Sequence, residues 1–256
     1  MSIEIPRRKI LKAGLASVAG ASGLAAAAKI ADRYGLLAPD HGGIFGAGEV
    51  LTYGAQRLLM FHHSMAREFN RAQISKVTRI NHRYPDDDDS LRLLKGDFAD
   101  WRLRVDGLVS HPTFFSLDEI KRMPSRSQIT MLACEEGWSY IAEWTGVSLS
   151  YLMNLVGADP KAKWVVFYPL DDFWGSIDMA EALHPQTLLA YRMNGEDLTD
   201  LIPGYGAPLR LRIPRQLGYK NLKYLVRISV VESLRIVGDG NGSAAPDIGY
   251  SWYAGI

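Results

Sequence analysis

The sequence predicts an α+β fold in which short strands and short helices surround a buried site. From about residue 101 onward, segments that alternate apolar and polar side chains, as strands do, are interleaved with short helical patterns. Residues 101–109 alternate in this way, and residues 163–168 form an apolar run typical of a buried strand. The composition, with 47% hydrophobic and 22% charged residues, is that of a globular protein and excludes a disordered or collagen-like chain.

The same patterns place the remaining elements. Residues 116–123 predict a helix, because Ser116 stands at the N-cap and Glu119 three positions later, which is a capping box. Asn194-Gly195 is typical of a tight turn. The consecutive acids at 86–89 lack the alternation and the glycine of a calcium loop, so we expect a solvated turn there. Further strands are expected at 128–133, 188–193, 209–213 and 224–232, short helices at 149–156 and 179–183, and an apolar helical stripe within 51–69.

The N-terminal residues have the pattern of an export signal. Arg7, Arg8, Lys9 and Lys12 are followed by an uncharged stretch of mostly small residues at 13–28. The paired arginines resemble a twin-arginine signal, although an amphipathic or buried helix is the alternative. We expect a signal peptide over 1–28 and export to the periplasm by the twin-arginine route. That route carries folded proteins, commonly around a cofactor, so it favours a tightly bound redox cofactor.

Charge and cysteine content exclude several classes of protein. The formal charge of +1, from 29 basic and 28 acidic residues, argues against a nucleic-acid binder that neutralises many phosphates. A single cysteine excludes an intramolecular disulfide framework, a cysteine-rich zinc site and a protein-ligated iron–sulfur cluster. The motif that attaches haem covalently is absent from the sequence.

That one cysteine, Cys134, follows a predicted strand and precedes a polar loop that contains glycine. Such positions expose reactive groups, so Cys134 is a candidate nucleophile, redox sensor or soft metal ligand. The alternative is an inert small hydrophobe in the core. The position alone leaves both interpretations open.

A basic cluster lies between residues 206 and 224. It contains Arg210, Arg212, Arg215, Lys220 and Lys223, and the nearby Gly206 and Gly218 permit close backbone approach. This pattern suits an anionic ligand such as a phosphate, and the alternative is a solvated basic strand. The Asn81-His82 pair offers hydrogen-bond donors and acceptors together, but on its own it indicates only a loop.

Three specific segments occur in order along the chain. They are Cys134-Glu-Glu-Gly-Trp with Trp144-Thr-Gly-Val-Ser-Leu, then Leu189-Ala-Tyr-Arg-Met-Asn-Gly, then Gly206-Ala-Pro-Leu-Arg through Gly218-Tyr-Lys-Asn-Leu-Lys-Tyr. Together they resemble the sulfite oxidase family of molybdenum enzymes, and most of all its exported bacterial members, which include a periplasmic methionine-sulfoxide reductase. The resemblance runs from about Arg79 to Glu232.

The resemblance implies a sulfite-oxidase-like fold around a molybdenum–molybdopterin cofactor. Cys134 would be the thiolate that ligates molybdenum, and Arg210 and Lys223 would hold the pterin phosphate. The implied reaction is two-electron oxygen-atom transfer, of the sulfite oxidation or sulfoxide reduction type, on a small oxyanion or an S- or N-oxide. Further implied cofactor contacts are the backbone of Asn221 and Leu222, the pair Asn81 and His82, and the backbone of Pro169.

One position departs from the family. Tyr205 stands where the family commonly has His or Asn. A contact of that residue with the cofactor or substrate is therefore either lost here or made by the phenol instead. Tyr205 is therefore a candidate catalytic residue beside Cys134, and the substrate stays open. The candidate substrate arginines are Arg104, Arg192, Arg212 and Arg215.

We expect four regions: the signal peptide at 1–28, a helical and loop extension at 29–75, the molybdopterin-binding domain at 76–237 and a tail at 238–256 that docks through Trp252 and Tyr253 or is disordered. No haem domain is expected, so electrons would pass to or from a separate soluble or membrane cytochrome. One alternative is an exported, non-enzymatic anion-binding protein that retains the fold. Another is a cysteine hydrolase, which requires a histidine beside Cys134.

Overall fold

The computed structural model describes residues 37–39, 46–59, 64–235 and 237–256. The expected signal peptide at 1–28 lies outside these residues, as do residues 29–36, 40–45 and 60–63 of the expected extension. Within the described ranges, no helix combines the length and the apolar character that crossing a membrane requires.

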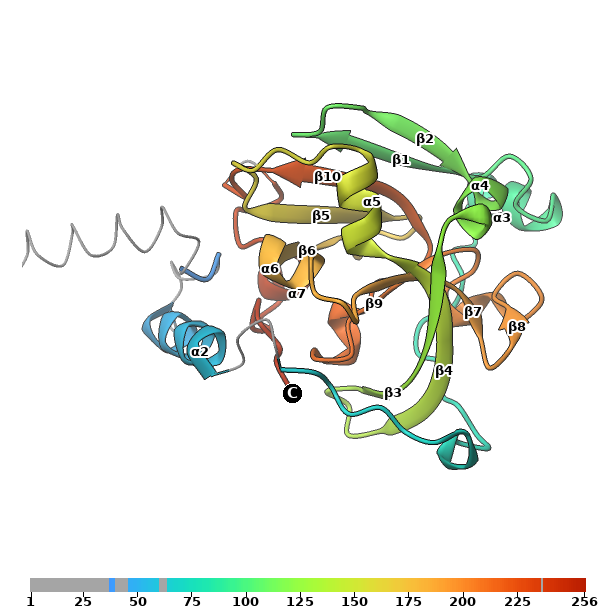
Figure 1. The fold of residues 1–256 in the computed structure, drawn as a ribbon, viewed down its shortest axis with the longest axis horizontal. Coiled ribbons are helices and arrows are strands. Elements are labelled where there is room, and N and C mark those ends of the chain that lie inside the picture. Colours follow the sequence, from blue (N-terminus) through green and yellow to red (C-terminus); the bar gives the residue numbers. More distant parts are fainter. Residues whose placement is uncertain (1–36, 40–45, 60–63, 236) are drawn as a thin grey trace, which may run out of the picture.

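Two five-stranded sheets form the body of the molecule (Figure 1). The first has the order β2-β1-β10-β5-β6, and its β1–β10 pair is parallel. The second has the order β3-β4-β7-β8, with β9 also paired to β7. The bounds are β1 Arg102–Gly107, β2 Thr113–Ser116, β3 Ser125–Ala133, β4 Ser139–Ser148, β5 Trp164–Pro169, β6 Gly175–Asp178, β7 Leu188–Met193, β8 Glu196–Asp197, β9 Arg210–Arg212 and β10 Leu225–Val231.

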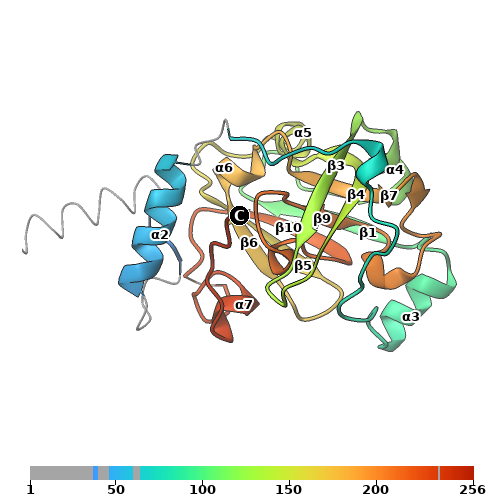
Figure 2. The ribbon, with the colours of Figure 1, turned by 90° about the horizontal axis from the view of Figure 1, so that it is seen from below.

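The helices are short and lie around the sheets. In Figure 2, α2 lies at one end of the molecule and α3 at the other. Three 3₁₀ turns, at Arg71–Gln73, Pro203–Tyr205 and Gly218–Lys220, complete the regular structure. The α-helices are α2 Gly46–Leu59, α3 Asp88–Lys95, α4 Leu117–Arg122, α5 Leu149–Leu155, α6 Met179–Ala182 and α7 Ala244–Asp247.

Local sequence signals account for many of these boundaries. The predicted capping box is present at α4, where the Ser116 hydroxyl accepts from the Glu119 amide and the Glu119 carboxylate accepts from the Ser116 amide. Ser148 caps α5 in the same way through the Tyr151 amide. Asn194 and Gly195 have φ values of 52° and 89°, which suit the tight turn between β7 and β8. The expected capping box at Ser116 and the expected turn at Asn194-Gly195 are confirmed, and the cap at Ser148 is a further one.

Two local expectations were wrong. The acids at 86–89 are exposed as expected, but they lead into helix α3 instead of a turn: Asp88 and Asp89 are its first residues, and the Asp87 carboxylate caps it by accepting from the Ser90 amide at 3.0 Å. Acidic side chains in the first turn are also favoured by the helix dipole. The helical stripe expected within 51–69 ends with α2 at Leu59, and residues 64–69 run extended, with Glu68 bridged to Thr130 of β3.

The hydrophobic residues divide into two cores. The larger one joins both sheets, and Trp101, Trp144 and Phe167 are among its buried side chains. The smaller one covers the other face of β5. There Trp252 packs edge-on against Trp164, with ring centroids 5.2 Å apart, so the C-terminal residues are docked rather than disordered.

Candidate functional site

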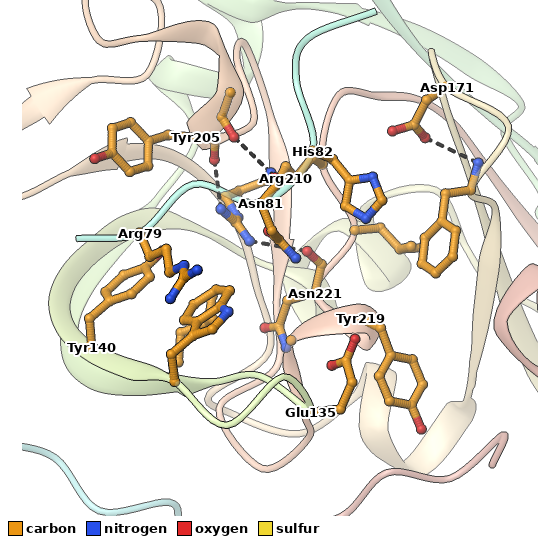
Figure 3. Close-up of a pocket in the computed structure, with 17 residues that line it drawn as sticks. Arg79, Asn81, His82, Glu135, Tyr140, Asp171, Tyr205, Arg210, Tyr219 and Asn221 are labelled. Carbon is orange, nitrogen blue, oxygen red and sulfur yellow. Dashed lines mark hydrogen bonds between the residues drawn. The ribbon is translucent and has the colours of Figure 1, made fainter. Parts of the chain in front are cut away.

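A cavity lies where four stretches of the chain meet (Figure 3). The stretches are 79–82, 132–140, 171–173 and 204–223. Strands position three of these stretches: β3 ends just before Cys134, β5 ends just before residue 171, and β9 begins at Arg210. The predicted site residues from distant parts of the sequence therefore converge on one cavity.

Cys134 is not itself one of the lining residues, but it adjoins them: Leu132 and Glu135, close to it in the chain, line the cavity, and a Cβ on the lining Gly218 would lie 3.6 Å from the Cys134 Cα. Its side chain is buried, and the thiol donates to the Glu135 carboxylate at 3.3 Å. Burial, and then the neighbouring Glu135, raise the pKa of the Cys134 thiol to about 11. The free protein therefore keeps it protonated, and a metal cation is the kind of partner that would deprotonate it.

A cysteine hydrolase would require a histidine base at this thiol. Among the described residues, no histidine hydrogen-bonds to Cys134. The structure therefore gives this alternative no support.

Arg210 and Lys223 form a cationic pair in the cavity wall. The Arg210 guanidinium donates to the carbonyls of Tyr205 at 2.6 Å and Asn221 at 3.1 Å, as Figure 3 shows. The Lys223 ammonium donates to the carbonyls of Gly204, at 2.8 Å, and Asn81. Within the described chain, neither cation has a carboxylate within salt-bridge distance, and the Nε of Arg210 is buried without a partner.

The electrostatics of this pair point to a missing anion. Burial lowers the pKa of Arg210, and burial followed by the charge of Arg210 lowers the pKa of Lys223 to about 7. Buried cations are normally paired, and these two are not. An anionic group placed between them would restore the balance, which fits a phosphate. The solvated basic strand considered as the alternative is wrong, because Arg210 and Arg212 are both buried.

The absence of a side chain at Gly206 leaves room for Arg210 and Lys223 to lie close together. Its φ is 113°, and a Cβ there would lie 3.0 Å from the Arg210 Cβ and 3.3 Å from the Lys223 Cγ. A larger residue would therefore be strained and would press on both cations. This is the close approach that the sequence predicted for Gly206.

Arg212 does not line the cavity, although it lies on the same strand as Arg210. Its guanidinium donates to the Asn221 side chain at 2.6 Å and to the Thr130 hydroxyl at 3.2 Å. Both Arg210 and Arg212 lie 4.8 Å from the ring centroid of Trp144. Arg212 therefore supports the wall from behind.

The other candidate arginines also lie away from the cavity lining. Arg104 pairs with Asp106 at 2.6 Å, Arg192 with Asp197 at 2.7 Å and Arg215 with Glu181 at 2.8 Å. The arginine that does line the cavity, besides Arg210, is Arg79.

The remaining predicted cofactor contacts divide into two groups. Asn81, His82, Asn221 and Leu222 all line the cavity. Pro169 does not, because it ends β5 paired with Leu225. The nearest lining residue along the chain is Asp171.

Tyr205 lines the cavity, but its phenol is engaged with the protein. The Tyr205 hydroxyl lies 2.6 Å from the Thr78 hydroxyl. The carbonyl of Tyr205 accepts from Arg210. Tyr205 therefore connects the cationic pair to residues 76–83.

Several lining residues were missed by sequence reasoning. Trp138 stacks on Tyr140, with ring centroids 6.0 Å apart and planes 3° apart, and the Arg79 guanidinium lies 5.8 Å from the Trp138 ring. The Glu-Glu-Gly-Trp loop that follows the strand was the sequence feature that could have indicated these residues. Nothing in the local sequence, however, shows that the side chains of this loop face a cavity. The missed residues are Arg79, Glu135, Trp138, Tyr140, Asp171, Phe173 and Tyr219.

Comparison with known proteins identifies the family. Residues 91–235 match the model of the oxidoreductase molybdopterin-binding domain. The chain belongs to this family, the molybdopterin-binding oxidoreductases of the sulfite oxidase type. Membership confirms the predicted fold class and the predicted class of enzyme.

The chain is similar to proteins named as methionine-sulfoxide reductases. It is 39% identical over 193 residues to a putative protein-methionine-sulfoxide reductase subunit, YedZ1, of Azospira oryzae, covering 75% of this chain and 69% of that protein. It is 35% identical over 150 residues to the protein-methionine-sulfoxide reductase catalytic subunit MsrP of Xanthomonas axonopodis, covering 52% of this chain and 46% of that protein. Among solved structures it resembles the sulfane dehydrogenase SoxCD of Paracoccus pantotrophus, with a TM-score of 0.49 and 25% identity over 53% of this chain and 39% of that one.

The residues present fit a molybdopterin. The unpaired cations suit its phosphate, the stacked rings of Trp138 and Tyr140 offer apolar surface to a flat heterocycle, and the lining carboxylate of Asp171 can accept from ring N–H groups. The thiol of Cys134 is a soft ligand at the edge of the same cavity. The site thus contains each kind of group that such a cofactor needs.

Proposed function

We propose that this protein is a periplasmic molybdenum-cofactor oxidoreductase that reduces methionine-sulfoxide-type substrates by two-electron oxygen-atom transfer. The observation that carries the proposal is the meeting of Cys134 with the unpaired cations Arg210 and Lys223 at one cavity. The direction of the reaction rests on the relatives, which are named protein-methionine-sulfoxide reductases. Sulfite oxidation is the competing direction.

In this proposal each residue has a defined role. Cys134 ligates molybdenum, Arg210 and Lys223 bind the pterin phosphate, and Asn81, His82 and Asp171 orient the pterin. When bound, the cofactor supplies the redox chemistry that exchanges an oxygen atom and two electrons with the substrate. The protein supplies binding, orientation and a partly dry cavity.

Two exposed apolar residues close in sequence to the cavity lining support a substrate carried on a peptide. Val77 is 82% exposed and lies two residues before the lining Arg79, and Ile202 is 64% exposed and lies two residues before Gly204. Exposed apolar side chains near such a site would suit the flanks of a bound polypeptide better than a small oxyanion. These apolar side chains would contribute nothing to the binding of sulfite.

The proposal also covers the location of the protein and the source of its electrons. The basic and then uncharged pattern of residues 1–28 supports export by the twin-arginine route. Electrons would come from a separate haem protein, soluble or bound to a membrane. The chain spans less than half the length of the Xanthomonas relatives it matches, so these features rest on inference from the family.

The test is an anaerobic assay on protein made in a host that synthesises molybdopterin. With a reduced dye as donor, we expect reduction of methionine sulfoxide, faster for a sulfoxide within a protein than for the free amino acid, and little oxidation of sulfite with an acceptor dye. Sulfite oxidation without sulfoxide reduction would contradict the proposed direction. A molybdenum-free protein that binds anions through Arg210 and Lys223 would instead support the non-enzymatic alternative.

A further inference from the structure

One wall of the cavity is held less firmly than the others. The chain that leads to it is tied to the second sheet by backbone hydrogen bonds, from the Phe69 amide to the Ile129 carbonyl and from the Ser75 amide to the Ile141 carbonyl, both 2.9 Å. Figure 1 shows this segment running beside β3 and β4. The firm attachment ends at Ser75.

Residues 76–83, which we call the strap, continue without such support. No backbone-to-backbone hydrogen bond joins the strap to the rest of the described chain. Three of its residues, Arg79, Asn81 and His82, nevertheless line the cavity (Figure 3). The position of this wall therefore depends on side-chain contacts.

The contacts come from the turn at residues 203–205, from Lys223 and from two aromatic rings. The Arg79 guanidinium lies 5.8 Å from the Trp138 ring, and His82 stacks on Phe173 with ring centroids 6.1 Å apart. The Tyr205 hydroxyl lies 2.6 Å from the Thr78 hydroxyl. Gly204 faces Ile80 so closely that a Cβ on Gly204 would lie 2.7 Å from the Ile80 Cγ2. The strap is thus gripped at two successive residues of the turn.

Lys223 links the strap to the cationic pair. Its ammonium donates to the Asn81 carbonyl on the strap and to the Gly204 carbonyl on the turn. An ammonium has three N–H donors, so one stays available for an anion in the cavity. A bound phosphate would favour the charged ammonium, which is the better donor to both carbonyls.

We propose that the Tyr205–Thr78 hydroxyl pair is a latch that holds the strap closed over the molybdopterin cavity. Tyr205 is then a positioning residue, which acts on the cofactor through Asn81 and His82, and not a catalytic one. This inference rests on the proposed function in taking molybdopterin as the ligand.

The test uses trypsin, because Lys76, Arg79 and Arg83 place cleavage sites within the strap. Cleavage there requires local opening, so its rate reports the open population when opening is fast. The holoenzyme and its Tyr205→Phe, Thr78→Val and doubly substituted variants are digested under native conditions, and the rate of molybdopterin release is measured in parallel. A partly buried hydroxyl pair of ordinary strength predicts strap cleavage and cofactor release that are about 3- to 10-fold faster in either single variant. The double variant is expected to match the singles, and Thr78→Ser to behave as the unsubstituted protein.

Tyr219→Phe is the matched control. Tyr219 also lines the cavity, but its hydroxyl donates to the Ser251 carbonyl at 2.7 Å, away from the strap. We expect strap cleavage to be unchanged in this variant. Unchanged strap cleavage in Tyr205→Phe would overturn the latch. The Tyr205 hydroxyl also donates to the Thr78 carbonyl at 3.5 Å, a bond that Thr78→Val keeps. Faster cofactor release in Tyr205→Phe without faster strap cleavage in the same variant would also overturn the latch, because the phenol would then contact the cofactor directly.

These readouts separate the latch from the proposed function. Neither measurement uses turnover, so a holoenzyme that reduces no sulfoxide would contradict the proposed function and leave the latch test intact. A protein that binds no molybdopterin would overturn the proposed function, and strap cleavage in the cofactor-free variants would still decide whether the hydroxyl pair holds the strap.

Discussion

The guanidinium of Arg212 donates to the side-chain oxygen of Asn221 at 2.6 Å, and this bond joins β9 to the segment that carries Lys223. The same oxygen accepts from the Ile213 amide at 2.7 Å. The amide group of Asn221 donates to the carbonyls of Gln216 and Leu217, at 3.1 and 2.9 Å. Asn221 thereby closes the loop behind the cationic pair, and its own carbonyl accepts from Arg210.

Asn221→Ala should therefore destabilise the fold. The substitution removes the four hydrogen bonds of the Asn221 side chain. Arg212, which is 0% exposed, thereby loses one of its buried hydrogen-bond partners. We expect a loss of about 3 kcal/mol in the free energy of unfolding, since a bond to a buried charge is among the costly ones to break. Urea denaturation of the cofactor-free protein measures it.

Asn154→Ala is the matched control for this prediction. Asn154 is exposed on α5, so its loss should change the stability by less than about 0.5 kcal/mol. Equal stabilities of the Asn221 and Asn154 variants would show that the loop does not depend on Asn221.

The pKa of Lys223, lowered to about 7 by burial and by Arg210, predicts that cofactor binding depends on pH. A bound phosphate raises this pKa, so above pH 7 binding must take up a proton. Affinity should then fall as the pH rises from about 7 toward the pKa of the bound form, by at most about tenfold per pH unit. Below pH 7 this source of pH dependence disappears.

Molybdopterin retention after equilibration at pH 6.5 and at pH 8.5 measures this effect. Lys223→Arg provides the comparison, because arginine stays charged at both values. We expect the arginine variant to retain the cofactor equally at the two values. A loss at pH 8.5 that is the same in both proteins would mean that another group controls retention.

His184 predicts a loss of stability in acid. It is 1% exposed, and burial, followed by the charge of Arg215, lowers its pKa below the ordinary value. In the unfolded chain it has a pKa of about 6.5, so below that pH the unfolded state binds more protons than the folded state. The free energy of unfolding therefore falls as the pH drops through about 6.5 toward the folded-state pKa.

His184→Asn isolates this contribution. The Asn oxygen can replace the Nδ1 atom that accepts from the Gln186 amide at 3.2 Å, but it does not titrate. We expect a flatter dependence of stability on pH between about 7 and 5 in the variant. Parallel curves for the two proteins would rule out His184 as the source.

The sequence was informative where local rules or specific motifs operate. The capping box of Ser116 and Glu119 needs only residues close in sequence, and it formed as expected. Cys134, Arg210 and Lys223 were singled out by residue type and position. The fold places Arg210 and Lys223 in the wall of one cavity and Cys134 next to its lining, near enough to Lys223 to affect its pKa.

Long-range contacts were beyond reach of the same reasoning. The Tyr205–Thr78 pair joins residues 127 positions apart, and no periodicity in the chain encodes that meeting. Arg212 lies two residues after Arg210 on β9, so the sequence pattern does not distinguish the two. In the structure the Arg212 guanidinium bonds to Asn221 and does not line the cavity, because the loop that carries Asn221 folds back behind β9. The acids at 86–89 are a different case, because their signal was local: Asp87 caps α3 through the amide of Ser90, three positions later, and sequence reasoning overlooked it.

The central claim is a bond from the Cys134 sulfur to molybdenum, and X-ray absorption at the molybdenum edge tests it most directly. Purified protein from a molybdopterin-making host is compared with its Cys134→Ser variant. The account predicts that molybdenum in the unsubstituted protein has one more sulfur neighbour than any molybdenum that remains in the variant. The same sulfur shell in both proteins, or an unsubstituted protein without molybdenum, would contradict it.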